Sequence, residues 1–343
     1  MDGRGVIVII GITGNQGGSV ARTFLHDPSL RSKYRIRGLS RDPTSESCKS
    51  LLDLGVPEIV QANLHDIGSL NRAFEGAEVI FSVTDFWHPF FDPKNRSVAE
   101  QAGKTIGKYA YDLEYEQGRN IADAAAKVPH LRRIIISMLN SPMKWSNGIY
   151  NELWHFESKA DMISYIQMRH INLASKMSTV QMGVFYTSWK FEFNALHGPQ
   201  KMEDGLYKMV TPCDPNAPVP LVDPRRDTGP FVRALLEVAP GVNLLGETSM
   251  LSSRDWLRLW AKIVGVERAE YVQCSVDEWD TALPDGKFGK ELADMFKYTG
   301  EFGYDGNDSG TIRKDQLGVP LRDLSSVEDY IRNEDWSSIG IGR

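Results

Sequence analysis

Residues 6–25 read VIVIIGITGNQGGSVARTFL, and this stretch decides the fold of the chain. It opens with an apolar, β-branched run, Val6–Ile10, which is typical of a strand buried in a parallel sheet. Three glycines follow at Gly-x-x-Gly-x-x-Gly spacing (Gly11, Gly14 and Gly17), and a helical pattern comes directly after them. The stretch therefore predicts a strand, a tight turn and a helix in immediate succession.

Such a turn indicates a site for the diphosphate of a dinucleotide. The first glycine permits the tight turn, the second lets the backbone approach the phosphates, and the third lets the helix pack closely on the sheet. The N-terminus of the helix adds unpaired N–H groups and a partial positive charge. Thr13, Asn15 and Gln16 offer side-chain donors. The alternative interpretation is a tight turn that binds no ligand.

The rest of the first half alternates between strand and helix patterns. Strand patterns cover Tyr34–Leu39, Glu58–Ala62, Glu78–Thr84, Arg133–Met138 and Thr179–Phe185. Helical patterns cover Gln16–His26, Ser45–Leu54, Ile67–Phe74, Tyr111–Ala126 and Glu152–Met168. This alternation predicts right-handed βαβ units and a doubly wound parallel sheet of the Rossmann type, in the α/β class.

In the second half strand and helix patterns alternate less regularly, which predicts a smaller C-terminal α/β domain. Residues 198–224 indicate loops with short strands, and helices are expected at Pro230–Val238, Asp255–Val264 and Val327–Arg332. Asp227 or Thr228 is the expected N-cap of the first of these helices, with Pro230 in its first turn. We expect residues 1–184 to form the Rossmann domain, with 219–265 returning to it. Residues 185–218 and 266–343 would then form the smaller substrate or partner domain.

Composition limits the possible functions of the 343 residues. The formal net charge of −6 argues against binding to nucleic acid, which needs a basic surface. Three widely spaced cysteines without a Cys-x-x-Cys pair suggest reduced thiols and a cytoplasmic location, or a nuclear one for a regulator. No apolar run approaches the roughly 18 residues of a membrane span, and the histidines show no metal-ligand spacing, so we expect neither membrane nor metal.

The end of the second predicted strand indicates which dinucleotide is bound. An NAD site usually places a carboxylate there for the ribose hydroxyls, whereas this chain has Ser40-Arg41. A guanidinium suits a 2′-phosphate by charge and by its paired donors, so Arg41 predicts NADP(H). The alternative is that Arg41 is a solvated loop residue.

Three residues match the catalytic pattern of short-chain dehydrogenases in part. That pattern has a Ser after the fifth strand and Tyr-x-x-x-Lys on the next helix, where positions four apart share one face. Ser137 and Lys159 fall at these places, but His155 stands where tyrosine is expected. A histidine can give or take a proton near neutrality, and Lys159 would lower the pKa of His155 by repulsion. The alternative is that His155 is a packed helix residue.

The chain resembles the NmrA-like family of atypical short-chain dehydrogenases/reductases along nearly its whole length, and most of all the NADPH-sensing branch of that family. The matching stretches are IGITGNQGGSVARTFL, LSRDP, SVTDFW, EYEQGRNIADAA, HFESKADMISYI, PQKMEDGLYKMV and PLVDPRRDTGP. The resemblance implies a Rossmann domain and a small C-terminal domain, with NADP(H) between them.

The resemblance also implies a set of cofactor-binding residues. They are Gly11, Ile12, Thr13, Gly14, Asn15, Gln16 and Gly17 at the diphosphate, Arg41 at the 2′-phosphate, Asn63 and Leu64 at the adenine, Thr84, Asp85 and Phe86 near the phosphates and nicotinamide ribose, Lys159 on that ribose, and Phe185, Tyr186, Thr187 and Ser188 over the nicotinamide. One departure is Glu116, where the sensing branch tends to carry lysine, so the loop 87–116 is expected to sit differently.

The family contains both reductases and non-catalytic sensors, so two functions stay open. The first is reduction of a C=O or C=N group of a small, secondary-metabolite-type substrate, with His155 as proton donor and Ser137 polarising the acceptor. Tyr150 is a second donor candidate, and the aromatic run Phe86–Phe91 with Tyr186 and Trp189 would line an apolar pocket or form a core. The second function is a redox-sensing regulator that binds a protein partner.

Overall fold

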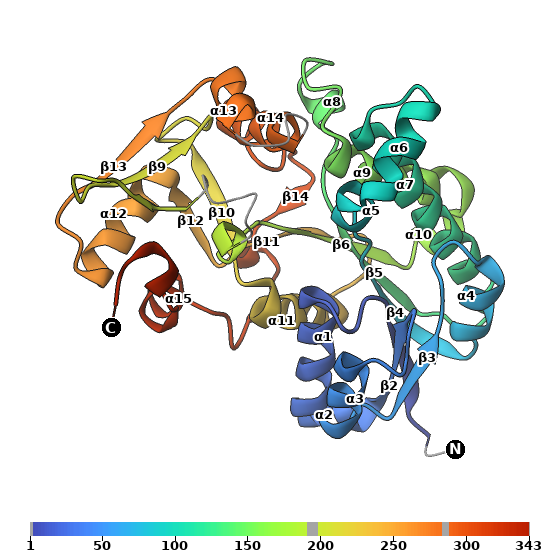
Figure 1. Cartoon of the computed structure of the whole chain (residues 1–343). Helices are drawn as coiled ribbons and strands as arrows, with labels where there is room; N and C mark the ends of the chain where they lie inside the picture. The colour runs from blue at the N-terminus through green and yellow to red at the C-terminus, as the bar shows by residue number, and fades with distance from the viewer. Residues whose placement is uncertain (1–2, 191–197, 283–287, 343) are drawn as a thin grey trace.

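The computed structural model describes residues 3–190, 198–282 and 288–342, and a large parallel sheet forms its centre (Figure 1). Within the described residues this sheet has eight strands, and each pairs in parallel with its neighbours. Their spatial order is β14 (Thr311–Ile312), β11 (Asn243–Gly246), β6 (Met177–Met182), β5 (Arg133–Met138), β4 (Ala77–Ser82), β1 (Gly5–Ile9), β2 (Tyr34–Ser40) and β3 (Glu58–Gln61).

Helices cover both faces of this sheet, as its apolar strands require. Alternate residues of one strand enter different cores: Ile7 and Ile9 pack on one face, and Val8 and Ile10 on the other. The first face carries α1 (Asn15–His26), α3 (Glu46–Asp53) and α11 (Pro224–Glu237), with α2 (Pro28–Lys33) beside α1. The second carries α4 (Ile67–Ala73), α7 (Ile106–Ala125) and α9 (Trp154–Arg169). The fold is therefore a doubly wound α/β sandwich of the Rossmann type.

The strand order reverses between β1 and β4, and this reversal places the site. Strands β2 and β3 lie on one side of β1, whereas β4, β5 and β6 follow on the other. In doubly wound sheets ligands bind at the carboxyl ends of the strands, in the crevice at such a reversal. The segments that follow β1, β2, β3 and β4 all begin at this edge.

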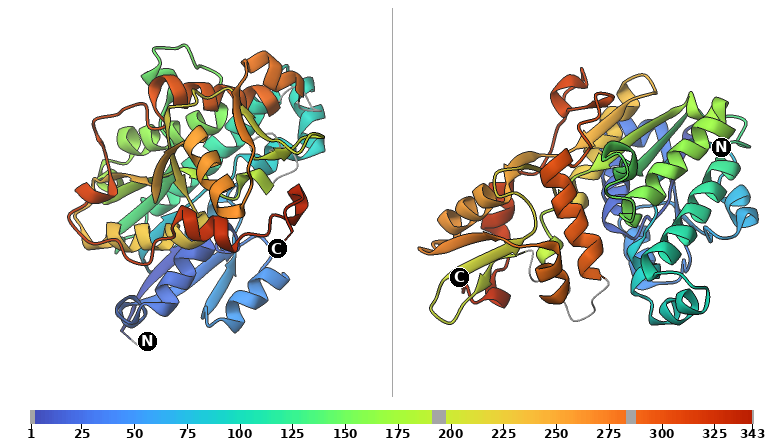
Figure 2. Two further views of the ribbon diagram at one scale, coloured as in Figure 1. Left: turned by 90° about the vertical axis from the view of Figure 1, so that its left-hand side faces the viewer. Right: turned by 90° about the horizontal axis from the view of Figure 1, so that it is seen from above.

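A second part of the molecule lies beside the large sheet and carries two small sheets (Figure 2). One has the order β12 (Ser249–Ser252), β10 (Pro218–Val222), β7 (Val184–Phe185); the other has β13 (Ala269–Gln273), β9 (Tyr207–Thr211), β8 (Gln200–Lys201). Helices α12 (Ser253–Val264), α13 (Val276–Ala282), α14 (Phe288–Phe302) and α15 (Val327–Asn333) complete it. Its aromatic core also contains Phe86, Phe90 and Phe156 from the large sheet's side, so the two parts share a packed interface.

The sequence patterns placed most strands and long helices correctly. Strands β1 to β5 and helices α1, α3, α4, α9, α12 and α15 lie within two residues of the predicted ranges. Helix α12 begins after the N-cap Ser252 and ends at Gly265, whose φ of 78° is the left-handed conformation that glycine adopts most easily. The expected division into domains stays a prediction. The strand pairings place β11, from segment 219–265, and β14, from the C-terminal segment, in the large sheet, while β12 joins a small one.

The predicted sixth strand, Thr179–Phe185, is wrong because two strands occupy that range. Strand β6 ends at Met182 in the large sheet, and β7 begins at Val184 in a small one. Gly183 lies between them, where an added Cβ would come within 2.6 Å of Pro220 O. The chain therefore leaves one sheet and enters the next at a point where only glycine fits.

The predicted start of the helix at Pro230 is also wrong. Helix α11 begins at Pro224, capped by the Asp223 carboxylate, which accepts a hydrogen bond from Arg225 N. Pro230 therefore lies inside the helix. Asp227, which the pattern placed at the cap, is instead fully buried and accepts hydrogen bonds from Ser325 N (2.7 Å) and Ser325 Oγ (2.6 Å).

The expected loop 87–116 is helical over most of its length. It forms α5 (Trp87–Phe91), α6 (Pro93–Gln101) and the first turns of α7, which starts five residues before the predicted Tyr111. Thr105 caps α7 by accepting a hydrogen bond from Lys108 N. The short helices α8 (Pro142–Trp145) and α10 (Ile171–Ala174) were not predicted either. Within the described ranges no helix is long and apolar enough to cross a membrane.

Candidate functional site

The glycine turn after β1 forms a close-packed cradle at the N-terminus of α1. Gly11 has φ +66°, and its carbonyl oxygen accepts a hydrogen bond from Gly14 N at 2.9 Å. A Cβ at Gly17 would lie 2.2 Å from Gly11 O, so the helix approaches the turn at a distance that only glycine allows. The first amide groups of α1 have no intrahelical partner, and an anion at this place would accept hydrogen bonds from them.

Three polar side-chain atoms near this cradle are buried without a hydrogen-bond partner. They are Gln16 Oε1 in α1, Ser82 Oγ at the end of β4 and Thr84 Oγ1 just beyond that strand. The Thr84 side chain belongs to a residue only 7% exposed. Because an unpaired buried polar atom is costly, these atoms favour a polar ligand at this edge of the sheet.

Arg41, which follows β2, contacts a histidine from the segment after β4. Its Nη1 lies 3.0 Å from His88 Nε2, and its carbonyl oxygen accepts a hydrogen bond from Gln61 Nε2. Both side chains are exposed. The sequence alone did not single out His88, although it lies in the same aromatic segment as Phe86. Arg41 therefore lies at the carboxyl edge in contact with a side chain of α5, the helix that follows β4.

The segment after β3 is held in place by α7. Asn63 Oδ1 accepts a hydrogen bond from His65 N, so this amide caps its own turn, and Leu64 O accepts one from Asn120 Nδ2 at 2.9 Å. Glu116 Oε2 lies 3.2 Å from His65 Nδ1. The negative charge that departs from the family pattern therefore has a histidine partner on the same surface.

The segment after β4 turns directly into α5. Asp85 Oδ1 accepts hydrogen bonds from Trp87 N (3.0 Å) and His88 N (3.3 Å), and so stabilises the first turn of that helix. Phe86 is 1% exposed, and its ring centroid lies 5.8 Å from that of His155. Of the two predicted roles for the aromatic run, the core role describes Phe86 and Phe90, which are both buried.

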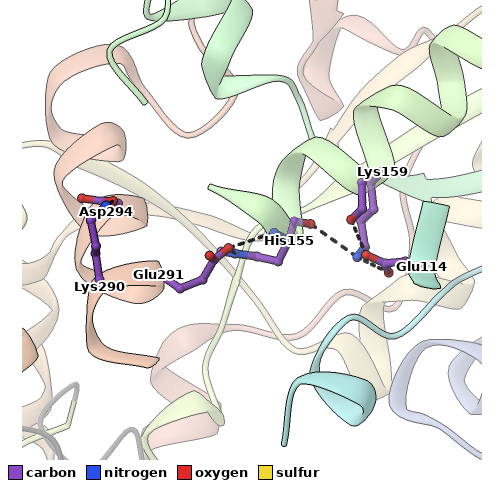
Figure 3. Close-up of polar contacts among 7 residues, drawn as sticks. Glu114, His155, Lys159, Lys290, Glu291 and Asp294 are labelled. Carbon is purple, nitrogen blue, oxygen red and sulfur yellow. Dashed lines mark hydrogen bonds and ion pairs between the residues drawn. The ribbon is translucent and has the colours of Figure 1, made fainter. Parts of the chain in front are cut away.

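His155 and Glu291 form a buried pair that joins the two parts of the molecule (Figure 3). Nδ1 of His155 lies 2.7 Å from Glu291 Oε1, and the main-chain N of His155 donates to the same oxygen at 2.8 Å. The two side chains are 7% and 4% exposed. The carboxylate requires a proton on Nδ1, which leaves Nε2 as the ring nitrogen for any other partner. Glu291 carries no signal in the sequence as a partner of His155, because no local pattern links α9 to α14.

Lys159, one turn further along α9, is paired with a buried carboxylate. Its Nζ lies 2.6 Å from Glu114 Oε1 on α7 (Figure 3). Glu114 also accepts a hydrogen bond from Ser158 Oγ. The Glu114 side chain is 1% exposed. Because Glu114 balances the charge of Lys159, the expected repulsion between Lys159 and a charged His155 is weaker than for an unpaired lysine.

The other two catalytic candidates lie in different environments. Ser137 is buried in β5, opposite Val180 of β6, and no hydrogen bond between described residues joins it to His155 or Lys159. The Tyr150 hydroxyl donates to Glu301 Oε2 at 2.8 Å, and burial, reinforced by that carboxylate, raises the pKa of Tyr150. Tyr150 is therefore a poor proton donor, whereas His155 keeps a ring nitrogen for this purpose.

The segment predicted to close over a nicotinamide lies on the small sheet. Phe185 ends β7, and the Tyr186 ring stacks on Tyr330 at 5.2 Å, with its hydroxyl 2.6 Å from Thr248 Oγ1. Ser188 Oγ donates to Phe185 O, and Thr187 O accepts from Lys190 N. Phe185, Tyr186, Ser188 and Trp189 line an apolar cavity of about 30 Å³, together with Leu221 and Trp256. That volume holds one or two waters.

The described residues contain no group of three or more His, Cys, Asp or Glu side chains placed to hold a metal ion. The residues at the carboxyl edge are instead a glycine cradle, an arginine, unpaired hydroxyl and amide oxygens, a buried His–Glu hydrogen bond and a buried Lys–Glu ion pair. A doubly wound fold with such a cradle at its strand reversal defines the class of Rossmann-type α/β proteins.

Residues 3–331 match the NmrA-like family, and the chain belongs to that family. The chain is similar to the NmrA-like oxidoreductase lnbB of Aspergillus flavus, at 36% identity over 37% of this chain and 33% of that protein. It therefore aligns with only about a third of that relative's length. The NmrA-like oxidoreductase ptmS of Penicillium ochrochloron is 24% identical over 98% of this chain and 95% of that protein.

The fold is also similar to that of solved NmrA. The structure of NmrA, a negative transcriptional regulator, in complex with NADP superposes with a TM-score of 0.68. The match covers 96% of this chain and 95% of that one, at 19% identity. The shared architecture spans both parts of the molecule.

Proposed function

We propose that this protein is an NADP(H)-dependent oxidoreductase that reduces a C=O or C=N group of a small substrate. One observation supports the proposal above all: His155 is held through Nδ1 by a buried carboxylate, at the helix position where short-chain dehydrogenases carry their proton donor. The relatives lnbB and ptmS are both named oxidoreductases, which supports the same class.

The residues at the carboxyl edge fit the cofactor. Gly17 lets the first turn of α1 pack against the turn after β1, where the first amides of the helix can bind phosphate oxygens, and Gln16 Oε1 and Thr84 Oγ1 are buried without a hydrogen-bond partner. Arg41 offers a guanidinium for the 2′-phosphate, with His88 beside it. NmrA, a protein of the same fold, has been solved in complex with NADP and with NAD, which supports a nicotinamide dinucleotide at this edge.

His155 supplies the proton in the proposed reaction. When bound, the reduced nicotinamide supplies a hydride to the acceptor carbon. As the acceptor oxygen or nitrogen gains charge, imidazolium Nε2 of His155 gives its proton to that atom, and the product leaves as an alcohol or amine. Glu291 stabilises the charged imidazolium through Nδ1–H and fixes the ring orientation. The packed rings of Phe86, Trp87 and Phe156 exclude water around it.

Loss of nicotinamide absorbance tests this function. Purified protein is mixed with NADPH and a panel of aldehydes, ketones and cyclic imines, and initial rates are compared for the native chain, His155→Gln and His170→Gln. His170 ends the same helix and pairs with Asp123 at 2.6 Å, outside the site, so it is the matched control. We expect turnover that His155→Gln alone reduces, by about a hundredfold. Equal rates in native and His155→Gln protein would remove His155 from the reaction.

A non-catalytic redox sensor is the second candidate, and one observation favours it. Lys159 is already paired with buried Glu114, and His155 is only 5% exposed, so both reactive groups are engaged by protein. NmrA, whose fold is shared, is itself described as a negative transcriptional regulator. In this role the chain would bind a protein partner in one cofactor state only.

Affinity capture separates the two candidates. The immobilised chain is exposed to an extract of its own source with NADP⁺, with NADPH and without either. Sensor function predicts a partner that is retained in one of these states and lost in Arg41→Asp protein. A chain that turns over a substrate and shows no cofactor-dependent partner supports the reductase.

A further inference from the structure

The diphosphate cradle carries no cation of its own. Its side chains between Gly11 and Gly17 are Ile12, Thr13, Asn15 and Gln16, none of which is charged. The helix N-terminus contributes only a partial positive charge, about half an elementary charge. A diphosphate carries about two negative charges, so the local backbone leaves part of that charge unbalanced. A cation from elsewhere in the fold would complete such a site.

Helix α11 brings such a cation, Arg225, to the glycine cradle. It packs along α1, and Gly229 allows the close approach: an added Cβ would lie 2.1 Å from Thr23 Oγ1, while Gly229 N donates to Ser19 Oγ at 2.9 Å. Figure 1 shows α11 and α1 next to each other, to the left of β4 and β2. This packing brings the first turn of α11, which contains Arg225, to the cradle.

Arg225 contacts the cradle directly. Its Nε donates to Asn15 Oδ1 at 2.8 Å, across 210 positions of sequence. Asn15 is the first residue of α1. Within the described residues neither terminal nitrogen of the Arg225 guanidinium makes a hydrogen bond, so both stay available while Nε is anchored. A guanidinium can bind two phosphate oxygens in parallel with such a pair.

A second guanidinium lies beside it. Arg22 Nη2 donates to Arg225 O at 2.8 Å, and burial, together with the positive charge of Arg225, lowers the pKa of Arg22. Asp223 is the nearby carboxylate that opposes this shift, and it is occupied in capping α11. In the described part of the chain no carboxylate forms an ion pair with Arg22 or Arg225. Two neighbouring cations without an ion-pair partner favour an anion close to them.

We propose that Arg225 binds the diphosphate of the dinucleotide and supplies the cation that the glycine cradle lacks. The inference rests on the proposed binding of a nicotinamide dinucleotide. It adds a residue outside the Rossmann βαβ units. Because the diphosphate is common to NADP(H) and NAD(H), Arg225 contributes affinity for both. Selection of NADP(H) over NAD(H) depends instead on Arg41, the proposed ligand of the 2′-phosphate.

Calorimetry tests the proposal with four ligands. NADPH, NADH and ADP-ribose contain the diphosphate, and adenosine 2′-monophosphate does not. They are titrated into the native chain, Arg225→Gln and Arg225→Lys, with Arg226→Gln as the matched control. Arg226 is the next residue of the same helix turn and is exposed. Melting temperatures of all variants check that each is folded.

We expect Arg225→Gln to weaken the three diphosphate ligands by about tenfold or more each, while affinity for adenosine 2′-monophosphate and the NADPH-to-NADH ratio stay unchanged. Arg225→Lys should keep part of the affinity, and that part should fall as salt rises. Unchanged affinities in folded Arg225→Gln, or equal losses in Arg226→Gln, would overturn the inference alone. A native chain that binds none of the dinucleotides would overturn the proposed function together with it.

Discussion

Glu291 of α14 holds the main-chain N and the ring Nδ1 of His155 through one carboxylate oxygen, across 136 positions of sequence. The pair fixes both the ring orientation and the tautomer of the proposed proton donor. It also joins the small C-terminal part to the helix that follows β5. A change in the packing of the two parts would therefore move the His155 ring and its Nε2, the nitrogen that we propose gives the proton.

Replacing Glu291 with leucine should remove the preference of His155 for the tautomer with its proton on Nδ1. In the native chain we expect the ¹⁵N spectrum of His155 to show the proton on Nδ1, whereas Glu291→Leu should move a large share of it to Nε2. Turnover should fall about a hundredfold, with the change in kcat rather than in KM. Lys297→Ala, at an exposed position of the same helix, should leave the spectrum unchanged. An unaltered His155 spectrum in Glu291→Leu would contradict the assignment.

Reversing the charge at Arg41 should abolish the preference for NADPH. Arg41→Asp replaces the proposed phosphate ligand with a like charge, so we expect the ratio of NADPH to NADH affinity to fall by about ten- to a hundredfold. Calorimetry measures both constants. Arg31→Asp makes the same change near the other end of β2 and should leave the ratio intact. A retained preference in Arg41→Asp would show that another residue binds the 2′-phosphate.

Removing the ammonium of Lys159 should destabilise the fold through Glu114. Lys159→Met leaves a carboxylate buried without its cation, which should cost about 3 kcal/mol of unfolding free energy. The double variant with Glu114→Gln should recover most of this loss, because no buried charge is left. Urea unfolding of the native chain, both single variants and the double variant gives the coupling. Additive losses would mean that the pair has no net interaction.

Asp227 should matter for stability rather than for ligand binding. Its carboxylate accepts hydrogen bonds from Ser325 N, Ser325 Oγ and Asp223 N, so Asp227→Ala leaves three buried donors unpaired. We expect a loss of about 3 kcal/mol in urea unfolding. Glu237→Ala, exposed at the other end of α11, should change stability by less than about 0.5 kcal/mol. Equal losses of unfolding free energy in the two variants would contradict the role of Asp227 in joining α11 to Ser325.

Substitution by alanine should change stability by different amounts at two adjacent glycines of α1. A Cβ at Gly17 meets the backbone at Gly11 O (2.2 Å), whereas one at Gly18 meets the flexible end of Arg22 first, at 3.2 Å. Gly17→Ala should therefore lose about 3 kcal/mol or more of stability, together with dinucleotide binding. Gly18→Ala should stay within about 1 kcal/mol of the native chain, since alanine favours the helix. Thermal unfolding and calorimetry of both variants decide this.

Some local features were encoded in the sequence and overlooked. Asp223-Pro224 is an N-cap followed by proline at the first helical position, and it marks the start of α11 better than Asp227-Thr228 does. Thr105 similarly marks the start of α7. The break at Gly183 had a weaker signal, because apolar residues continue on both sides and only the approach of Pro220 requires glycine.

The sequence by itself determined the first strand, the glycine turn and the helix after it, and the βαβ alternation as far as β6. Each of these depends on periodicity and turn chemistry within a few residues, so neighbouring positions carry the whole signal. Only the tertiary structure decided that His155 meets Glu291, that Lys159 meets Glu114 and that Arg225 meets Asn15. These pairs join residues 136, 45 and 210 positions apart. They exist because tertiary packing brings helices from separate segments together, and no local pattern records which side chains that packing brings into contact.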